Sequence, residues 1–252
     1  MVSQAQCQGE PTGKSGACFA LSFRQRIAEE KTIVTAVIFD IDGTLIDSVD
    51  LHAAAWQAAL ERFGKKTSFE KVRRQIGKGA DQLMPVFLSQ DELIKFGDKL
   101  NDYRSELFKS EFLPRVKAFP SVRQLFQRIL RDDKRIVLAS SAKGDELKAY
   151  KTIAGIDDLV EGETSSDDAA RSKPYPDIFQ AALAQLGDVS PDNVLVVGDT
   201  IYDAEAAGKA HLRTIGVMCG GWSGDDLRQA GCIAVYRDPA NLLYAYDASP
   251  IS

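Results

Sequence analysis

A nearly unbroken apolar run at residues 34–39 is the feature that most limits how this chain can fold. The run reads Val-Thr-Ala-Val-Ile-Phe, and such a β-branched segment is typical of a strand buried on both faces, as in a parallel sheet. Asp40, Asp42 and Gly43 follow it directly. Ligands of open α/β sheets bind at the carboxyl ends of the strands. The two acidic side chains point the same way and repel each other, so the pattern indicates a site that a cation or a proton neutralises.

The pattern of apolar residues changes along the chain and predicts two kinds of structure. Residues 49–115 carry only helical stripes, whereas strand and helix patterns alternate after Pro120. We therefore expect an α/β fold in which a Rossmann-like parallel-sheet core carries an inserted all-helical cap domain. The expected parts are a loose N-terminal tail (1–30), the α/β core (31–48 and 116–245), the helical cap (49–115) and a C-terminal tail (246–252).

Polar side chains follow three of the predicted strands. They are Asp40 and Asp42 after the first, Ser140 and Ser141 after residues 135–139, and Asp199 and Asp203 after residues 194–197. Parallel strand ends meet at one edge of a sheet, so these groups are expected to converge. Carboxylates without a cluster of His or Cys suit Mg²⁺, with Asp40 and Asp199 as its direct ligands.

Composition excludes several classes of function. The chain has 252 residues and a net charge of −5, with no basic run of the nucleic-acid-binding type and no apolar stretch of membrane-spanning length. We therefore expect neither a nucleic-acid nor a membrane partner, and an anionic substrate would need a metal or a placed lysine. The four cysteines lack the close pairing of a zinc site, which favours a reduced, cytoplasmic setting. Oligomeric state is not indicated.

Four short motifs, in order, resemble those of the haloacid dehalogenase-like (HAD) hydrolases. The first, Asp-x-Asp-Gly-Thr, is matched by Phe-Asp-Ile-Asp-Gly-Thr-Leu-Ile-Asp-Ser at 39–48. The others are matched by Val-Leu-Ala-Ser at 137–140, by Lys173-Pro174, and by Gly198-Asp199 with Asp203. The resemblance spans residues 32–243. The segments beginning at Ser140 and Ser172 are similar to the branch that contains phosphoglycolate phosphatases and β-phosphoglucomutases.

The resemblance implies a Mg²⁺-dependent phosphatase that acts on a small phosphomonoester, such as a phosphoglycolate-like compound or a sugar phosphate. Asp40 would be the nucleophile and would form an aspartyl-phosphate. Asp42 would protonate the leaving oxygen and then deprotonate water, while its backbone carbonyl binds the metal. Ser140 would hydrogen-bond a phosphate oxygen, and Lys173 would hold the phosphoryl group among the carboxylates.

The remaining site residues have weaker signals. The predicted metal ligands are Asp40, Asp42 and Asp199, with Asp203 behind them. The predicted substrate contacts are Ser140, Lys173, Thr44, Ser141, His52 and Lys78. His52 lies one helical turn from Trp56 near the acidic motif, and Lys78 lies between two glycines. Each has a structural alternative: the serines can cap the next helix, and Lys78 can be a solvated loop residue.

Three other functions compete with the phosphatase. A dehalogenase needs no acid at position 42 and no metal, so the acidic residues argue against it. A β-phosphoglucomutase-like enzyme uses a loop arginine for a second phosphate, and this chain has Lys78-Gly79-Ala80 in that region. A non-catalytic binding protein on the same fold is also conceivable. It would be favoured by loss of a motif residue, and none is lost.

Overall fold

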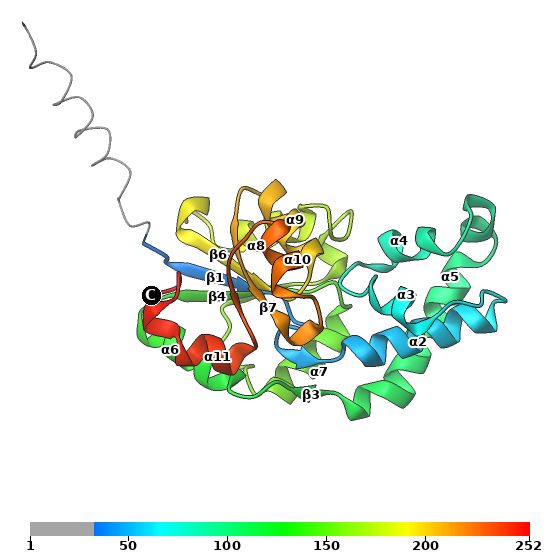
Figure 1. Cartoon of the computed structure of the whole chain (residues 1–252), viewed down its shortest axis with the longest axis horizontal. Coiled ribbons are helices and arrows are strands. Elements are labelled where there is room, and N and C mark those ends of the chain that lie inside the picture. The colour runs from blue at the N-terminus through cyan, green and yellow to red at the C-terminus, as the bar shows by residue number, and fades with distance from the viewer. Residues whose placement is uncertain (1–32) are drawn as a thin grey trace, which may run out of the picture. The chain divides into compact units, whose positions relative to one another are not determined.

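A parallel β-sheet forms the centre of the computed structural model, which describes residues 33–252 (Figure 1). Its strands are β1 (Ala36–Phe39), β4 (Arg135–Ala139), β5 (Gly162–Thr164), β6 (Val194–Gly198), β7 (Arg213–Val217) and β8 (Cys232–Tyr236). They lie in the order β5–β4–β1–β6–β7–β8, and all neighbours are parallel. The chain builds outward from β1 to β4 and β5, then returns to β6 on the other side of β1. Such a switch point is where α/β sheets bind ligands.

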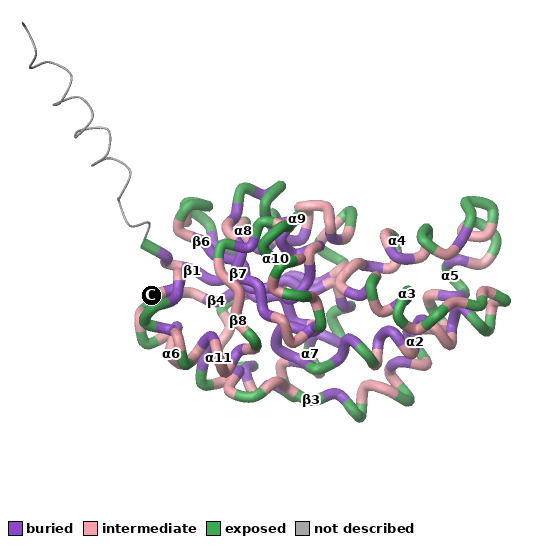
Figure 2. The backbone as a smooth tube through the Cα atoms, viewed as in Figure 1, coloured by how far each residue is buried: buried purple, intermediate pink, exposed green. Residues whose placement is uncertain are grey.

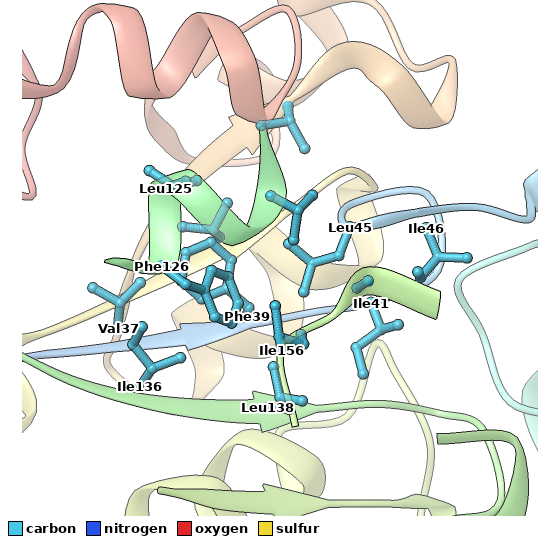
Figure 3. Packing of buried hydrophobic residues seen from close by; sticks show 14 of the residues in the cluster. Val37, Phe39, Ile41, Leu45, Ile46, Leu125, Phe126, Ile136, Leu138 and Ile156 are labelled. Carbon is cyan, nitrogen blue, oxygen red and sulfur yellow. The ribbon is translucent and has the colours of Figure 1, made fainter. Parts of the chain in front are cut away.

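Strand β1 is buried on both faces, which explains its unbroken apolar sequence. All four of its residues are fully buried, and the strands of the sheet are mostly buried in Figure 2. Phe39 packs against Phe126, with the ring centroids 4.7 Å apart (Figure 3). Ile38 belongs to a second apolar cluster that includes Phe179. The two clusters lie on opposite faces because successive strand residues point to opposite sides.

Helices cover both faces of the sheet. Residues of α6 (Val122–Arg131) and α7 (Gly144–Ala154) belong to the same apolar cluster as Phe39. Residues of α8 (Asp177–Gln185) and α9 (Ile201–Lys209) belong to the cluster of Ile38. The core also contains α10 (Gly224–Gln229) and α11 (Pro239–Tyr244). This arrangement confirms the predicted α/β fold with a Rossmann-like sheet.

An all-helical cap is inserted directly after β1. Two short antiparallel strands, β2 (Ile46–Asp47) and β3 (Lys117–Ala118), pair where the chain leaves and re-enters the core. Between them lie α2 (Val49–Arg62), α3 (Phe69–Arg73), α4 (Ala80–Leu83) and α5 (Gln90–Leu107). The cap has its own apolar cluster, which includes Trp56, Leu60 and Leu100. The predicted insertion is confirmed, and the domain limits 49–115 stay a prediction.

The C-terminal residues differ from the sequence prediction. Residues 246–252 are predicted to form a C-terminal tail, but Tyr246 is 2% exposed and Ile251 is fully buried in the main apolar cluster. The guanidinium carbon of Arg128 on α6 also lies 4.2 Å from the centroid of the Tyr246 ring. Two apolar residues in a short polar segment make no recognisable periodicity, so only tertiary packing reveals them as part of the core.

Two other sequence predictions concern regions at the limits of the structure. The predicted N-terminal tail, 1–30, lies outside the described residues. Within residues 33–252, no helix combines the length and the hydropathy that are needed to cross a membrane.

Candidate active site

The ends of three neighbouring strands bring the predicted acidic and hydroxyl groups together. Asp40, Ser140 and Asp199 directly follow the last residues of β1, β4 and β6, respectively. The Asp40 N–H donates to the carbonyl of Val197 at 2.9 Å, so the β1–β6 ladder continues into the site. The Ser140 N–H donates to Thr164 at 3.0 Å in the same way on the β4–β5 side. The backbone of the site is therefore held by the sheet.

Lys173 forms a buried ion-pair chain with two of the carboxylates. It is 1% exposed, pairs directly with Asp40 Oδ1, and places its Nζ 2.7 Å from Asp203 Oδ1. The other oxygen of Asp203 accepts hydrogen bonds from the Thr200 N–H at 3.0 Å and its hydroxyl at 2.6 Å, which cap helix α9. Asp203 is thus bound on both oxygens, and it positions Lys173 beside Asp40.

Thr44 lies between Asp40 and Asp199 and does not line a cavity. Its Oγ1 is 3.1 Å from Asp40 Oδ2 and 3.0 Å from Asp199 Oδ1, and the residue is fully buried. The single hydroxyl hydrogen can donate to only one of them at a time. In the structure its hydroxyl contacts the two carboxylates, and the predicted contact between Thr44 and substrate stays a prediction.

The carboxylate cluster has the features of a divalent-cation site. One oxygen each of Asp40, Asp199 and Asp203 lies within 4.8 Å of the others, and Asp199 Oδ2 is buried without a hydrogen-bond partner. A Cβ at Gly43 or Gly220 would collide with that carboxylate, so the two glycines keep the space beside it open. Gly43 also has φ +87°, a conformation that favours glycine. These hard oxygen donors fit Mg²⁺.

The electrostatics of the cluster show the cost of burying it. Burial raises the pKa of Asp40 to about 7, although neighbouring Lys173 acts in the opposite direction. Burial, with repulsion from Asp40 and Asp203, raises the pKa of Asp199 well above its ordinary value. Burial alone would lower the pKa of Lys173, but Asp203 and Asp40 outweigh it and raise that pKa. A bound cation would oppose the upward shifts of the carboxylates.

Asp42 points away from the carboxylate cluster. Its Oδ1 accepts a hydrogen bond from the Ser48 hydroxyl at 2.6 Å and lies 3.0 Å from His52 Nε2. That nitrogen is also 3.0 Å from the Tyr150 hydroxyl, and the ring stacks on Phe108 at 3.9 Å. Burial would raise the pKa of Asp42, but His52 and Ser48 outweigh it and hold that pKa below its ordinary value. The Asp42 side chain therefore faces His52, and the predicted binding of the metal by the Asp42 backbone carbonyl stays a prediction.

The two serines that follow β4 lie in different surroundings. The Ser140 side chain is fully buried and its Oγ accepts a hydrogen bond from the Ala142 N–H at 3.0 Å. Ser141 lines the cavity described next. The Ser140 hydroxyl thus closes a local turn and does not cap helix α7, whose N-cap residue is Lys143.

A cavity of about 390 Å³ lies between the core and the cap. Asp40, Asp42 and Ser141 line it from the core, and His52 and Lys78 line it from the cap. The Lys78 ammonium donates to Gln75 Oε1 at 2.7 Å and lies 4.6 Å from the ring of Tyr202. Burial lowers the pKa of Lys78. His52 and Lys78 thus both line the cavity, and their predicted contact with substrate stays a prediction.

Other cavity residues were not recognised from the sequence. They include Trp56, Asn101, Arg104 and Glu146. Arg104 lies on α5, where its neighbours form an amphipathic stripe and a polar residue reads as solvent-facing. Glu146 lies in the first turn of α7, a common position for an acid at a helix N-terminus. Neither has a motif, so no sequence signal distinguishes them from surface residues.

The cap is tied to the core on two sides of the cavity. The Ser172 N–H donates to Asp81 Oδ2 at 3.1 Å. The Tyr202 hydroxyl donates to the Arg74 carbonyl at 2.7 Å, and the Arg74 guanidinium lies 4.8 Å from the ring of Trp222. These contacts place the cap directly over the acidic cluster.

The family is shown by the match between residues 37–217 and the model of the haloacid dehalogenase-like hydrolases. The matched segment contains the strand ends, the carboxylate cluster and the whole cap. The chain belongs to the haloacid dehalogenase-like hydrolases. It is thus an enzyme of this HAD family, in agreement with the order of its four motifs.

Relatives and solved structures extend this family assignment. The chain is 27% identical over 208 residues to a phosphorylated carbohydrates phosphatase of Thermotoga maritima, covering 80% of this chain and 94% of that protein. It is 28% identical over 187 residues to a phosphoglycolate phosphatase of Aquifex aeolicus, covering 71% and 82%. The crystal structure of a hydrolase from Pseudomonas syringae is similar with a TM-score of 0.76 and 27% identity, covering 84% and 98%.

Proposed function

We propose that this HAD hydrolase is a Mg²⁺-dependent phosphatase that hydrolyses a small phosphomonoester through an aspartyl-phosphate on Asp40. The observation that carries the proposal is the placement of Asp40: it lines the cavity, pairs with Lys173 and adjoins Asp199. The similarity to proteins named as phosphatases of phosphorylated carbohydrates and of phosphoglycolate supports it. Phosphoryl transfer depends mostly on positioning and charge stabilisation, which this cluster can supply.

The proposed reaction has two steps. An Asp40 oxygen attacks phosphorus, the ester P–O bond breaks, and Asp42 gives a proton to the leaving oxygen. Asp42 then takes a proton from water as the water oxygen attacks phosphorus, which releases phosphate and regenerates Asp40. A phosphoryl dianion close to Asp42 raises the pKa of that carboxyl by repulsion, so it can hold the proton before the first step. His52 holds the Asp42 side chain in place.

Mg²⁺ would be held by Asp40, Asp199 and the backbone carbonyl of Asp42, and it would offset the negative charge of the phosphoryl group. Lys173 adds a fixed positive charge on the other side of Asp40. Asp203 remains behind the site, because both of its oxygens already have partners.

A β-phosphoglucomutase-like activity is the second candidate, and one observation favours it. In the sequence, the cap loop around Lys78 and Gly79 has no arginine that could bind a second phosphate. In the structure, however, Arg104 of the cap lines the cavity. Glu146 lines the same cavity and its negative charge weakens a second phosphate site there. We therefore keep water as the final phosphoryl acceptor.

The deciding experiment measures products. The enzyme with Mg²⁺ is given a panel of small phosphomonoesters, and separately β-glucose 1-phosphate with a trace of the bisphosphate. We expect stoichiometric free phosphate from at least one ester and little glucose 6-phosphate. Efficient conversion to glucose 6-phosphate without free phosphate would establish the mutase, and no free phosphate from any ester would contradict the proposed phosphatase.

The described residues also bear on the cellular location and the partners of this enzyme. We propose a reducing, cytoplasmic location, since Cys219 and Cys232 are free thiols. The partner is a small phosphorylated metabolite, and neither nucleic acid nor membrane is proposed.

A further inference from the structure

The cavity contains a carboxylate that the proposed chemistry does not use. Glu146 on α7 is 3% exposed, and its Oε1 is buried without a hydrogen-bond partner among the described residues. A buried acceptor left without a partner costs about 1–3 kcal/mol, and more when it is charged. Core positions rarely keep such a group unless something satisfies it. Because Glu146 lines the cavity, a bound molecule can supply the missing donor.

An arginine in the same cavity is also incompletely paired. The Nε of Arg104 on α5 is buried without a partner, and its Nη2 makes only a long 3.4 Å hydrogen bond to Asn101 Oδ1. The guanidinium lies 4.9 Å from the ring of Trp56, which fixes its plane. Burial lowers the pKa of Arg104, and the charge of Glu146 opposes that shift. The described residues show no direct ion pair between Arg104 and Glu146 within 4.0 Å.

We propose that Glu146 and Arg104 bind hydroxyl groups of the substrate, which is therefore the phosphate ester of a sugar or sugar alcohol. This inference rests on the proposed phosphatase function and narrows its substrate class. A hydroxyl group both donates and accepts, so it can donate to Glu146 while it accepts from Arg104. Hydrogen bonds to charged partners of this kind are stronger than those between neutral groups.

The same pair disfavours a substrate whose second group is a carboxylate. A carboxylate beside Arg104 would also face Glu146, and like charges in a partly desolvated cavity repel. A phosphoglycolate-like ester therefore gains less from this cavity than a polyol ester of similar size. The cavity volume of about 390 Å³ is also within the range of sites that enclose whole small molecules.

Beside the charged Lys78, Asp81 and Lys143, the cavity carries uncharged polar groups that suit a hydroxylated substrate. They include donors and acceptors from both the cap and the core: Asn101, Ser141, Ser166 and Ser172. An amino-acid phosphate could instead place its ammonium on Glu146 and its carboxylate on Arg104. It would leave these neutral groups unused, so we treat it as an alternative outcome of the test.

The experiment compares substrates and one isosteric substitution. Initial rates with Mg²⁺ are measured for sorbitol 6-phosphate, glucose 6-phosphate, 2-phosphoglycolate and O-phosphoserine, with acetyl phosphate reporting the chemistry alone. We expect kcat/KM for the better of the two polyol esters to exceed that for 2-phosphoglycolate at least tenfold. Glu146→Gln should lower kcat/KM for the polyol ester several-fold, mainly through KM, and raise it for 2-phosphoglycolate because the repulsion is removed. The matched control, Glu111→Gln, alters an exposed residue outside the cavity and should change neither value.

Opposite changes for the two substrates are what a merely structural role of Glu146 cannot produce. The inference is overturned if 2-phosphoglycolate or O-phosphoserine is the preferred ester, or if Glu146→Gln lowers all rates equally. If not even acetyl phosphate is hydrolysed, the phosphatase proposal fails, and calorimetric binding to the Asp40→Asn protein decides the inference. Tighter binding of the polyol ester than of 2-phosphoglycolate, weakened by Glu146→Gln, supports it, and equal binding refutes it.

Discussion

At the scale of single residues, the two aspartates of the first motif have different surroundings despite being two positions apart. Asp40 contacts Lys173 and lies in the carboxylate cluster, whereas Asp42 contacts Ser48 and His52. Alternate positions along a strand point to the same side, yet the Asp42 carboxylate contacts Ser48 and His52 and not the cluster around Asp40. The pair thereby separates into a candidate nucleophile and a candidate acid–base group.

Replacement of either aspartate should show these roles. Asp40→Asn is expected to abolish turnover, because it removes the nucleophilic oxygen. Asp42→Asn should lower kcat by about 10²–10⁴-fold, the usual contribution of general acid–base catalysis. Both variants should still bind a phosphate analogue in calorimetry. A near wild-type rate for Asp40→Asn would contradict the covalent mechanism.

Asp199 should reveal the metal site without any activity measurement. Asp199→Asn is expected to weaken Mg²⁺ binding at least tenfold in calorimetry, since it removes a charge from the cluster. In chelator the same variant should melt at or above the wild-type temperature, because burial and repulsion from Asp40 already disfavour this carboxylate. Exposed Asp192 provides the control, Asp192→Asn. Unchanged Mg²⁺ affinity in Asp199→Asn would show that the ion binds elsewhere.

At the scale of elements, helix α9 joins the chemistry to the cap. Its N-terminal turn holds Asp203 against Lys173, and its Tyr202 donates a hydrogen bond to the Arg74 carbonyl of the cap. The centroid of the Tyr202 ring lies 5.8 Å from the centroid of the Trp222 ring and 4.6 Å from the Lys78 Nζ. One helix therefore positions a charged group of the site and a contact that joins the cap to the core.

Removing the Tyr202 hydroxyl should loosen this contact. Tyr202→Phe loses a hydrogen bond worth about 0.5–1.5 kcal/mol, which corresponds to a roughly two- to thirteenfold weakening of this contact between cap and core. We expect KM to rise by about that factor, with a melting temperature within about 2 °C of wild type. Tyr236→Phe, on strand β8, serves as the matched control. An unchanged KM in Tyr202→Phe would show that this contact does not limit closure.

At the scale of the whole molecule, the C-terminal residues complete the main apolar cluster. Tyr246 and Ile251 are almost fully buried there, whereas nearby Tyr244 is 91% exposed. Burial of such side chains is the main source of stability in a domain of this size. The last residues of the chain thus stabilise the core that carries the site.

The contrast between the two tyrosines makes this testable. Ile251→Ala is expected to lower the free energy of unfolding by about 2–5 kcal/mol, and Tyr246→Ala by a similar amount. In a protein of this length each kcal/mol lowers the melting temperature by about 2–4 °C. Tyr244→Ala, the exposed control, should change it little. Melting of Ile251→Ala at the wild-type temperature would mean that the segment does not pack as described.

The sequence alone determined the sheet, the insertion and the chemical type of the site. Apolar periodicity is local, so it predicts strands and helices, and parallel strand ends must meet at one edge, so Asp40, Ser140 and Asp199 converge. Tertiary structure alone decided the cavity contacts of Arg104 and Glu146, the turn of Asp42 towards His52, and the burial of Ile251. These depend on packing between segments far apart in the chain, where a polar or apolar residue has no local pattern to distinguish it from one at the surface.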